Sequence, residues 1–264
     1  MSTPFNTTLG IKDTAQNVKD FISTNHDLFL SLWKPLIPYV FGLTVLDIIV
    51  TSFFMDDDSE FSLGGIIASY FMVALVISWH RVVIHGPDNF TAMNPFKPQK
   101  HELVFMGVGV LLGLMFFIFG VISGLLGALM GTYVLVPLLI VAMIGSFYIM
   151  YKLSFYFPAK AVNSAITFKQ SFDLTKGYCW KMVLATLLAA LKIILLMILY
   201  IVIASLVLGG LASFLSGPIA ESILTILLVT PIVLYVQPMV TLIGVTVLSN
   251  YYQHALQHKP HSES

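Results

Sequence analysis

Long apolar runs alternate with short polar segments along most of this chain of 264 residues. Each run can cross about 30 Å of hydrocarbon, because a helix rises about 1.5 Å per residue. Six such runs predict an all-α fold, a polytopic integral membrane helical bundle with six transmembrane helices. The predicted spans are 34–54, 62–84, 102–123, 131–152, 181–208 and 219–249.

Glycines and prolines punctuate these runs. Gly124, Gly127 and Gly131 predict a tight hairpin turn between the third and fourth spans. Small residues spaced four apart, such as Gly109 and Gly113, predict close helix packing within the chain or, alternatively, a dimer face. Three prolines are expected to kink the helices that contain them: Pro137, Pro231 and Pro238.

The polar segments predict three parts and two further helices. Residues 1–33 form an N-terminal amphipathic segment, 34–250 the transmembrane domain and 251–264 a cytoplasmic tail. Within the first part, residues 11–30 predict an amphipathic helix, since its apolar residues share one face. That face carries Ile11, Ala15, Val18, Ile22 and Phe29. The elbow, residues 153–180, predicts a short cytoplasmic helix that Pro158 opens and Gly177 caps.

Composition and charge agree with a membrane protein. Apolar residues make up 58% of the chain and charged residues 10%, against about 25% charged in soluble domains. The net charge is zero, which argues against nucleic acid as a partner. In the predicted topology every Lys and Arg except Lys192 lies on one side, which the positive-inside rule makes the cytoplasm. Both termini are therefore expected in the cytoplasm.

Asp47 and Lys192 are charges within predicted spans. They lie roughly 20 Å and roughly 16 Å from the cytoplasmic ends of the first and fifth spans. An isolated charge at such depth costs several kcal/mol, which pairing offsets. We therefore predict that these spans are neighbours and that the two residues form an intramembrane ion pair. The pair serves either packing and registry or a transport path to which Gln237 contributes.

Aromatic and basic residues at the ends of two spans predict contacts with lipid headgroups or the membrane interface. The residues are Trp79, Arg81, Lys176 and Trp180. Membrane anchoring alone explains the same residues equally well.

No motif predicts catalysis, a cofactor or a metal. The sequence has no phosphate-binding loop, no HExxH, no GxSxG and no dinucleotide fingerprint. His254, His258 and His261 lack carboxylate or cysteine partners, so they make a weak metal site. Cys179 is the single cysteine and predicts a free thiol. We expect no catalytic, cofactor-binding or metal-binding residues.

Two strings in the elbow form a recognisable pattern. LSFYFPAKAV at 153–162 and SFDLTKGYCWK at 171–181 are similar to "RLSxxxPA" followed by "SWxLTxGxxWR". Trp79, His80 and Arg81 similarly match a "WHRF" string. The chain thus resembles the membrane-domain superfamily associated with glycerophosphodiester phosphodiesterases and its bacterial inner-membrane relatives. Phe172 and Lys181 depart from the pattern, which has Trp and Arg there.

This resemblance implies a helical bundle in the bacterial inner membrane. It carries over no hydrolase activity, because no phosphodiesterase catalytic domain is attached to these residues. We therefore expect a non-enzymatic accessory or scaffolding protein whose partners include membrane lipids. The alternative is a small-solute or lipid transporter with a polar core around Asp47 and Lys192. An intramembrane enzyme is a third class, for which no group of residues converges.

Overall fold

A computed structural model describes residues 7–54, 63–130, 132–212 and 217–258 of the chain. Over these residues the fold is all-helical, as predicted. The helices are α1 (Ile11–Thr24), α2 (His26–Trp33), α3 (Ile37–Phe54), α4 (Leu63–His85), α5 (Lys100–Met130), α6 (Thr132–Leu153), α7 (Tyr156–Ala161), α8 (Phe168–Leu174), α9 (Cys179–Ala212), α10 (Pro218–Pro231), a π-helical segment (Ile232–Val236) and α11 (Gln237–Gln257).

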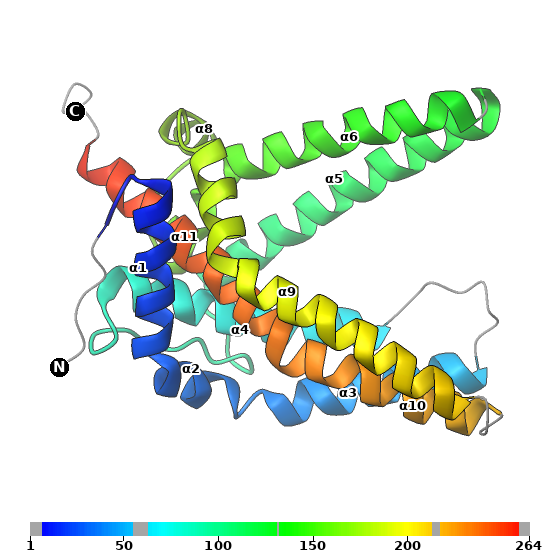
Figure 1. The fold of residues 1–264 in the computed structure, drawn as a ribbon. Coiled ribbons are helices and arrows are strands. Elements are labelled where there is room, and N and C mark those ends of the chain that lie inside the picture. Colours follow the sequence, from blue (N-terminus) through cyan, green and yellow to red (C-terminus); the bar gives the residue numbers. More distant parts are fainter. Residues whose placement is uncertain (1–6, 55–62, 131, 213–216, 259–264) are drawn as a thin grey trace.

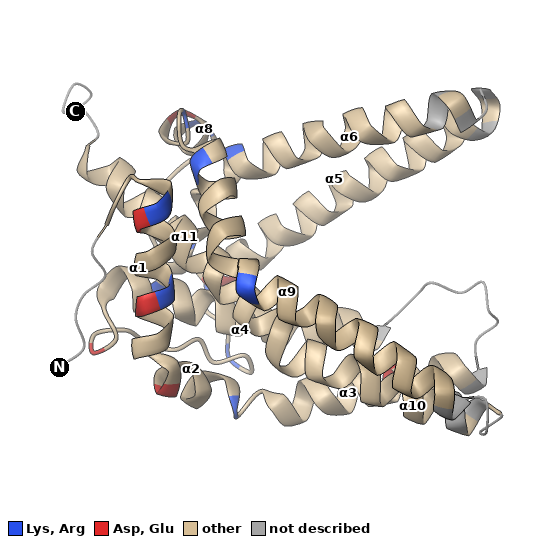
Figure 2. Cartoon of the chain, in the orientation of Figure 1, with Lys and Arg blue, Asp and Glu red and all other residues tan. Residues whose placement is uncertain are grey.

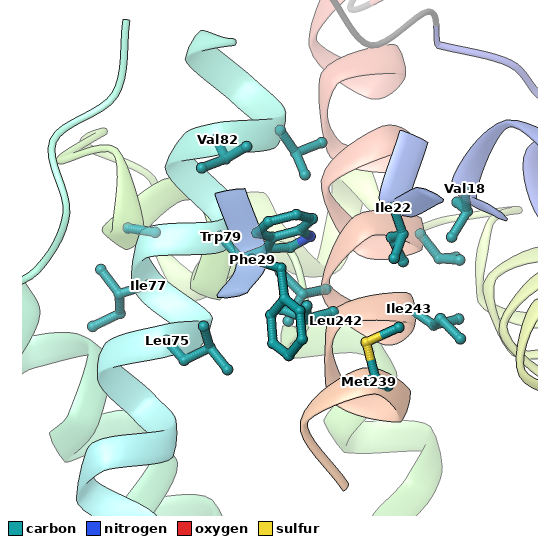
Figure 3. Close-up of a cluster of buried hydrophobic side chains, with 14 of the residues drawn as sticks. Val18, Ile22, Phe29, Leu75, Ile77, Trp79, Val82, Met239, Leu242 and Ile243 are labelled. Atoms are coloured by element: carbon teal, nitrogen blue, oxygen red, sulfur yellow. The ribbon is translucent and has the colours of Figure 1, made fainter. Parts of the chain in front are cut away.

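The molecule has a compact body from which two arms extend (Figure 1). The body comprises α1, α2, α7, α8, the end of α4, the start of α9 and most of α11. Large side chains from these elements pack into one core, and Figure 3 shows its centre around Trp79, Phe29 and Leu242. The apolar face predicted for residues 11–30 lies against this core, with Ala15 and Val18 fully enclosed. Burial of this face fixes the N-terminal segment to the body.

The arms are apolar and exposed. One is the α5–α6 hairpin, and the other combines α3, the start of α4, the rest of α9 and α10 (Figure 1). On α9 the residues Met182, Ala185 and Ala189 are buried in the core, whereas leucines both before and after Lys192 are exposed. They include Leu184, Leu191, Leu195 and Leu199. Soluble proteins rarely expose so large an apolar surface to water. The surface of the arms is therefore compatible with contact with lipid.

Within the described residues, five helical stretches are long and apolar enough to cross a membrane, and the number is six if a bent pair counts as one span. The bent pair is α2 with α3, which meet at an angle of 57°. Pro35 lies in this break and Pro38 in the first turn of α3, and neither offers an N–H to a helix. The two prolines thus interrupt the first predicted span near its start.

The predicted glycine turn is placed too early. Helix α5 continues through Gly124 and Gly127 to Met130, while Gly131 lies outside the described residues. Glycine is tolerated in membrane helices, so composition alone did not mark the turn. A Cβ added at Gly109 or Gly113 would meet no atom within 4 Å. These glycines therefore do not mediate the close packing within the chain that their spacing predicts.

The last span is interrupted where its prolines predict a kink. Pro231 ends α10, Pro238 lies in the first turn of α11, and the π-helical segment separates them. Trp33 Nε1 donates to the carbonyl of Leu234 in this segment at 2.7 Å. The bond satisfies one carbonyl of the irregular backbone, as membrane proteins require.

Helix α11 continues well beyond the predicted span. Tyr251, Tyr252 and Ala255 are buried in the body core. Residues 251–258 are therefore structural, and the predicted tail begins later than residue 251.

The elbow folds into two short helices, α7 and α8, instead of one. Thr167 and Gln170 form a reciprocal capping box at the start of α8. The hydroxyls of Ser171 and Thr175 donate to the carbonyl of Lys152 at 3.1 and 3.3 Å. The C-cap of α8 is Thr175, and not Gly177 as predicted. Gly177 lies two residues later in the turn to α9, with φ of +81°, a conformation that favours glycine.

Candidate functional site

Arg81 is the centre of a charged cluster in the body. Its NH2 lies 2.7 Å from Glu102 Oε1 and 2.9 Å from His101 Nε2. Its Nε donates to the carbonyl of Ala161 at 2.7 Å, and its NH1 donates to that of Thr91 at 3.0 Å. We call this set the Arg81 clamp, because it joins α4, α5, α7 and the loop that follows α4.

The clamp is an internal structural device. Glu102 is only 1% exposed, and its second oxygen accepts a bond from the Gln99 N–H at 2.7 Å. Arg81 is itself buried, and its guanidinium group makes four polar contacts within the protein. This arrangement differs from the predicted lipid contact of Arg81, since an already paired guanidinium has little left to offer a headgroup. Sequence reasoning missed Glu102, although an acid at the start of an apolar span is a signal of such a pair.

An open polar pocket of about 380 Å³ adjoins the clamp. Arg81, His85, Asn89 and His101 are among the residues that line it. A second pocket shares His101 and adds Lys100 and Lys160. Both pockets suit a small anion chemically, but both are wide open to solvent.

Trp79 and His80 face the interior instead of the membrane interface. Trp79 is fully buried, and its Nε1 donates to Thr246 Oγ1 at 2.9 Å. His80 Nδ1 lies 2.7 Å from Ser249 Oγ. The predicted interfacial position of Trp79 is thus replaced by a core position, because α11 covers this face of α4.

The elbow carries the two predicted interface residues that are exposed. Trp180 is 76% exposed. Lys176 forms an exposed ion pair with Asp173 at 2.8 Å, and the pair lowers the pKa of Asp173 and raises the pKa of Lys176 through hydrogen bonding and charge. Both side chains are exposed, so they can meet a membrane surface or a partner.

Asp47 lies where α3 meets α4. Its Oδ1 accepts a bond from the Gly64 N–H at 3.0 Å. A Cβ added at Gly64 would lie 2.7 Å from both Asp47 Cβ and the carbonyl oxygen of Leu43. The carboxylate therefore accepts from an N–H in the first turn of α4, where the helix dipole favours a negative charge.

Lys192 lies where α9 leaves the body. It lines a pocket of about 600 Å³ together with Lys19, Ser23 and His26 of the N-terminal helices. The apolar part of the lining comprises Ile22, Ala189, Ile193, Met239 and Ile243. We call this the Lys192 pocket.

The structure does not bring Asp47 and Lys192 into an ion pair. Among the described residues, the two ion pairs are Arg81–Glu102 and Lys176–Asp173. Helix α1 packs on α9 and supplies the neighbours of Lys192, whereas α3 packs on α4 and α10. Gln237 is exposed at the start of α11.

Over the described part of the chain, no three metal-ligating side chains gather in one place. The rings of His254 and His258 stack at 4.0 Å, and His261 lies outside the described residues. Cys179 is a free thiol, as its being the single cysteine requires.

Comparison with protein-family models, with curated proteins and with solved structures finds no match to this chain.

Proposed function

We propose that the chain is a multi-pass protein of the bacterial inner membrane, with six spans and both termini in the cytoplasm. The observation that carries the proposal is the segregation of charge (Figure 2). Lys and Arg residues gather on the body and where α9 leaves it, and the described parts of the arms beyond Lys192 show no Lys or Arg. No Lys or Arg occurs in 37–54, 101–151, 193–212 or 217–258. The positive-inside rule then favours a cytoplasmic body.

This arrangement also explains Lys192 more simply than deep burial in lipid does. Lys192 is the last basic residue of α9, and the buried residues Met182, Ala185 and Ala189, which join this helix to the body core, all precede it. A lysine at that boundary reaches the interface with its ammonium group while its stem stays apolar. The bent α2–α3 pair supplies the first of the six spans in this topology: α3 crosses the membrane, and α2 stays with the body.

We further propose an accessory or scaffolding role without catalysis, in which the body acts as a docking platform. The buried polar side chains of the body support this role, because they bond to one another: Trp79 to Thr246, His80 to Ser249 and Arg81 to Glu102. The exposed elbow, with Trp180 and Lys176, offers the surface that meets lipid or a partner. A transporter centred on Asp47 and Lys192 receives less support, because the two residues lie among different helices. Asp47 bonds to α4, whereas Lys192 lies beside α1 and α2.

Kinship with the membrane domains associated with glycerophosphodiester phosphodiesterases remains part of this proposal. Three of the matching elbow residues support it, because they have structural tasks. Ser171 and Thr175 bond to the carbonyl of Lys152, and Gly177 adopts the positive φ that ends the elbow.

Two experiments test the proposal. Alkaline carbonate washing should leave the protein in the membrane fraction, and release into the supernatant would contradict membrane insertion. A photo-crosslinking amino acid at Trp180 should then capture lipid or another protein in cells. The same substitution at buried Trp79 is the control, and equal crosslinking at both positions would contradict the platform role.

A further inference from the structure

The Lys192 pocket combines two kinds of surface in one place. Two lysines and a histidine come from α9, α1 and α2, and the rest of the lining is mainly apolar. Figure 3 shows Ile22 of α1 facing Ile243 and Met239 of α11 across part of this apolar lining. Cationic groups beside an apolar surface match an amphiphile with an anionic head.

The charge around the pocket favours an anion. Lys19, His26 and Lys192 line it, and its described lining includes no carboxylate. Asp20 and Asp27 follow Lys19 and His26 in sequence, but neither lines the pocket. Lysine ammonium groups bind phosphate through charge-assisted hydrogen bonds, and Ser23 adds a hydroxyl donor.

The apolar surface continues from the pocket along the arm. Leu195, Leu196 and Leu199 follow Lys192 at helical spacings of three, four and seven residues, so they share its face of α9. All three are more than half exposed. An acyl chain can lie along this face while its headgroup stays beside Lys192.

We infer that the Lys192 pocket is a binding site for an anionic phospholipid. The phosphate lies between Lys192 and Lys19, and the acyl chain follows α9 toward the centre of the membrane. This inference rests on the proposed membrane insertion, because it places the pocket at the boundary between body and bilayer. It adds a defined site and a ligand class to the proposed function.

Native mass spectrometry of the full-length protein from detergent tests the site, with phosphatidylglycerol and phosphatidylcholine as probes. We expect the wild type to retain phosphatidylglycerol preferentially. Lys192→Gln should weaken its binding about tenfold, as loss of one charge-assisted bond predicts. Lys19→Gln should have a similar effect, whereas Lys192→Arg should restore binding.

The matched control is Lys169→Gln, which removes the same charge from exposed α8. Equal loss in K169Q and K192Q, or no preference for phosphatidylglycerol, would overturn the inference. Competition by millimolar inorganic phosphate would also overturn it, since a free anion would then be the ligand. Carbonate washing separates the two proposals: a chain that resists extraction but lacks this preference contradicts the lipid site alone.

Discussion

Glu102 and Arg81 form an ion pair in the body, and both side chains are buried. A buried pair is costly to break from one side, because the remaining charge is left without compensation. Removing one partner costs about 3–5 kcal/mol in comparable sites. Such a pair contributes little net stability over apolar packing, but it fixes which segments meet.

We therefore expect Glu102→Gln to lower the free energy of unfolding by about 3 kcal/mol. Thermal unfolding of the protein in detergent would report this as a lower midpoint temperature. Asp173→Asn is the control, because it removes a carboxylate from an exposed pair and should leave the midpoint nearly unchanged. Equal midpoints for E102Q and D173N would contradict the structural role of the clamp.

The three tryptophans differ sharply in exposure, and this supports a second prediction. Trp33 and Trp79 are enclosed, while Trp180 is open on the elbow. In single-tryptophan variants reconstituted into vesicles, brominated lipids or aqueous acrylamide should quench Trp180 strongly. The same quenchers should affect Trp79 little, and strong quenching of Trp79 would place it at the interface that the sequence predicted.

For single residues, the sequence showed which side chains have a special role but not what surrounds them. Trp79 and Arg81 were selected as interfacial because they end an apolar run. Whether such residues face lipid or protein depends on which helix covers them, and that is a long-range property. The cover comes from α11 and α7, about 80 to 170 positions away in sequence.

At the scale of elements, the contact between α3 and α4 depends on a missing side chain. A Cβ at Gly64 would meet the backbone oxygen of Leu43 at 2.7 Å, so the helices would have to move apart. Close approach through small residues is a general means of packing helices in membranes. Here the glycine also lets its N–H reach Asp47.

Gly64→Ala should consequently destabilise the protein by about 1–3 kcal/mol, the usual cost of overpacking. The matched control is Gly42→Ala on α3, where an added Cβ would meet nothing within 4 Å. We expect G42A to be neutral or slightly stabilising, because alanine favours helix. Thermal midpoints of the two variants in one detergent provide the comparison, and similar losses would contradict the close contact.

Element positions were predictable from hydropathy, but their interruptions were only partly so. Pro231 and Pro238 marked the π-helical segment, since a missing N–H is a local property. Helix α6, however, continues through Pro137, and the break between α2 and α3 was not predicted. Glycines misled the placement of the hairpin turn, because a glycine inside a membrane helix and a glycine in a turn look alike in sequence. The Lys192 neighbourhood depended on α1 packing against α9, which no local pattern encodes.

At the scale of the whole molecule, burial and charge follow the same division. The body holds the core and the basic residues, whereas the arms expose apolar side chains such as Tyr133, which is 96% exposed. The sequence predicted an all-helical protein with apolar spans because hydropathy is additive along the chain. It did not predict a body with two arms, because that division depends on which helix ends pack together.

Cysteine accessibility in intact cells tests the central claim most directly, namely that the arms cross the membrane from a cytoplasmic body. In a Cys179→Ser background, single cysteines would replace Tyr133 and Ser52 at the arm ends and Gln170 on the body. We predict that a membrane-impermeant maleimide labels the first two from outside, and labels position 170 only after permeabilisation. Labelling of position 170 in intact cells, with protection of both arm ends, would contradict the account.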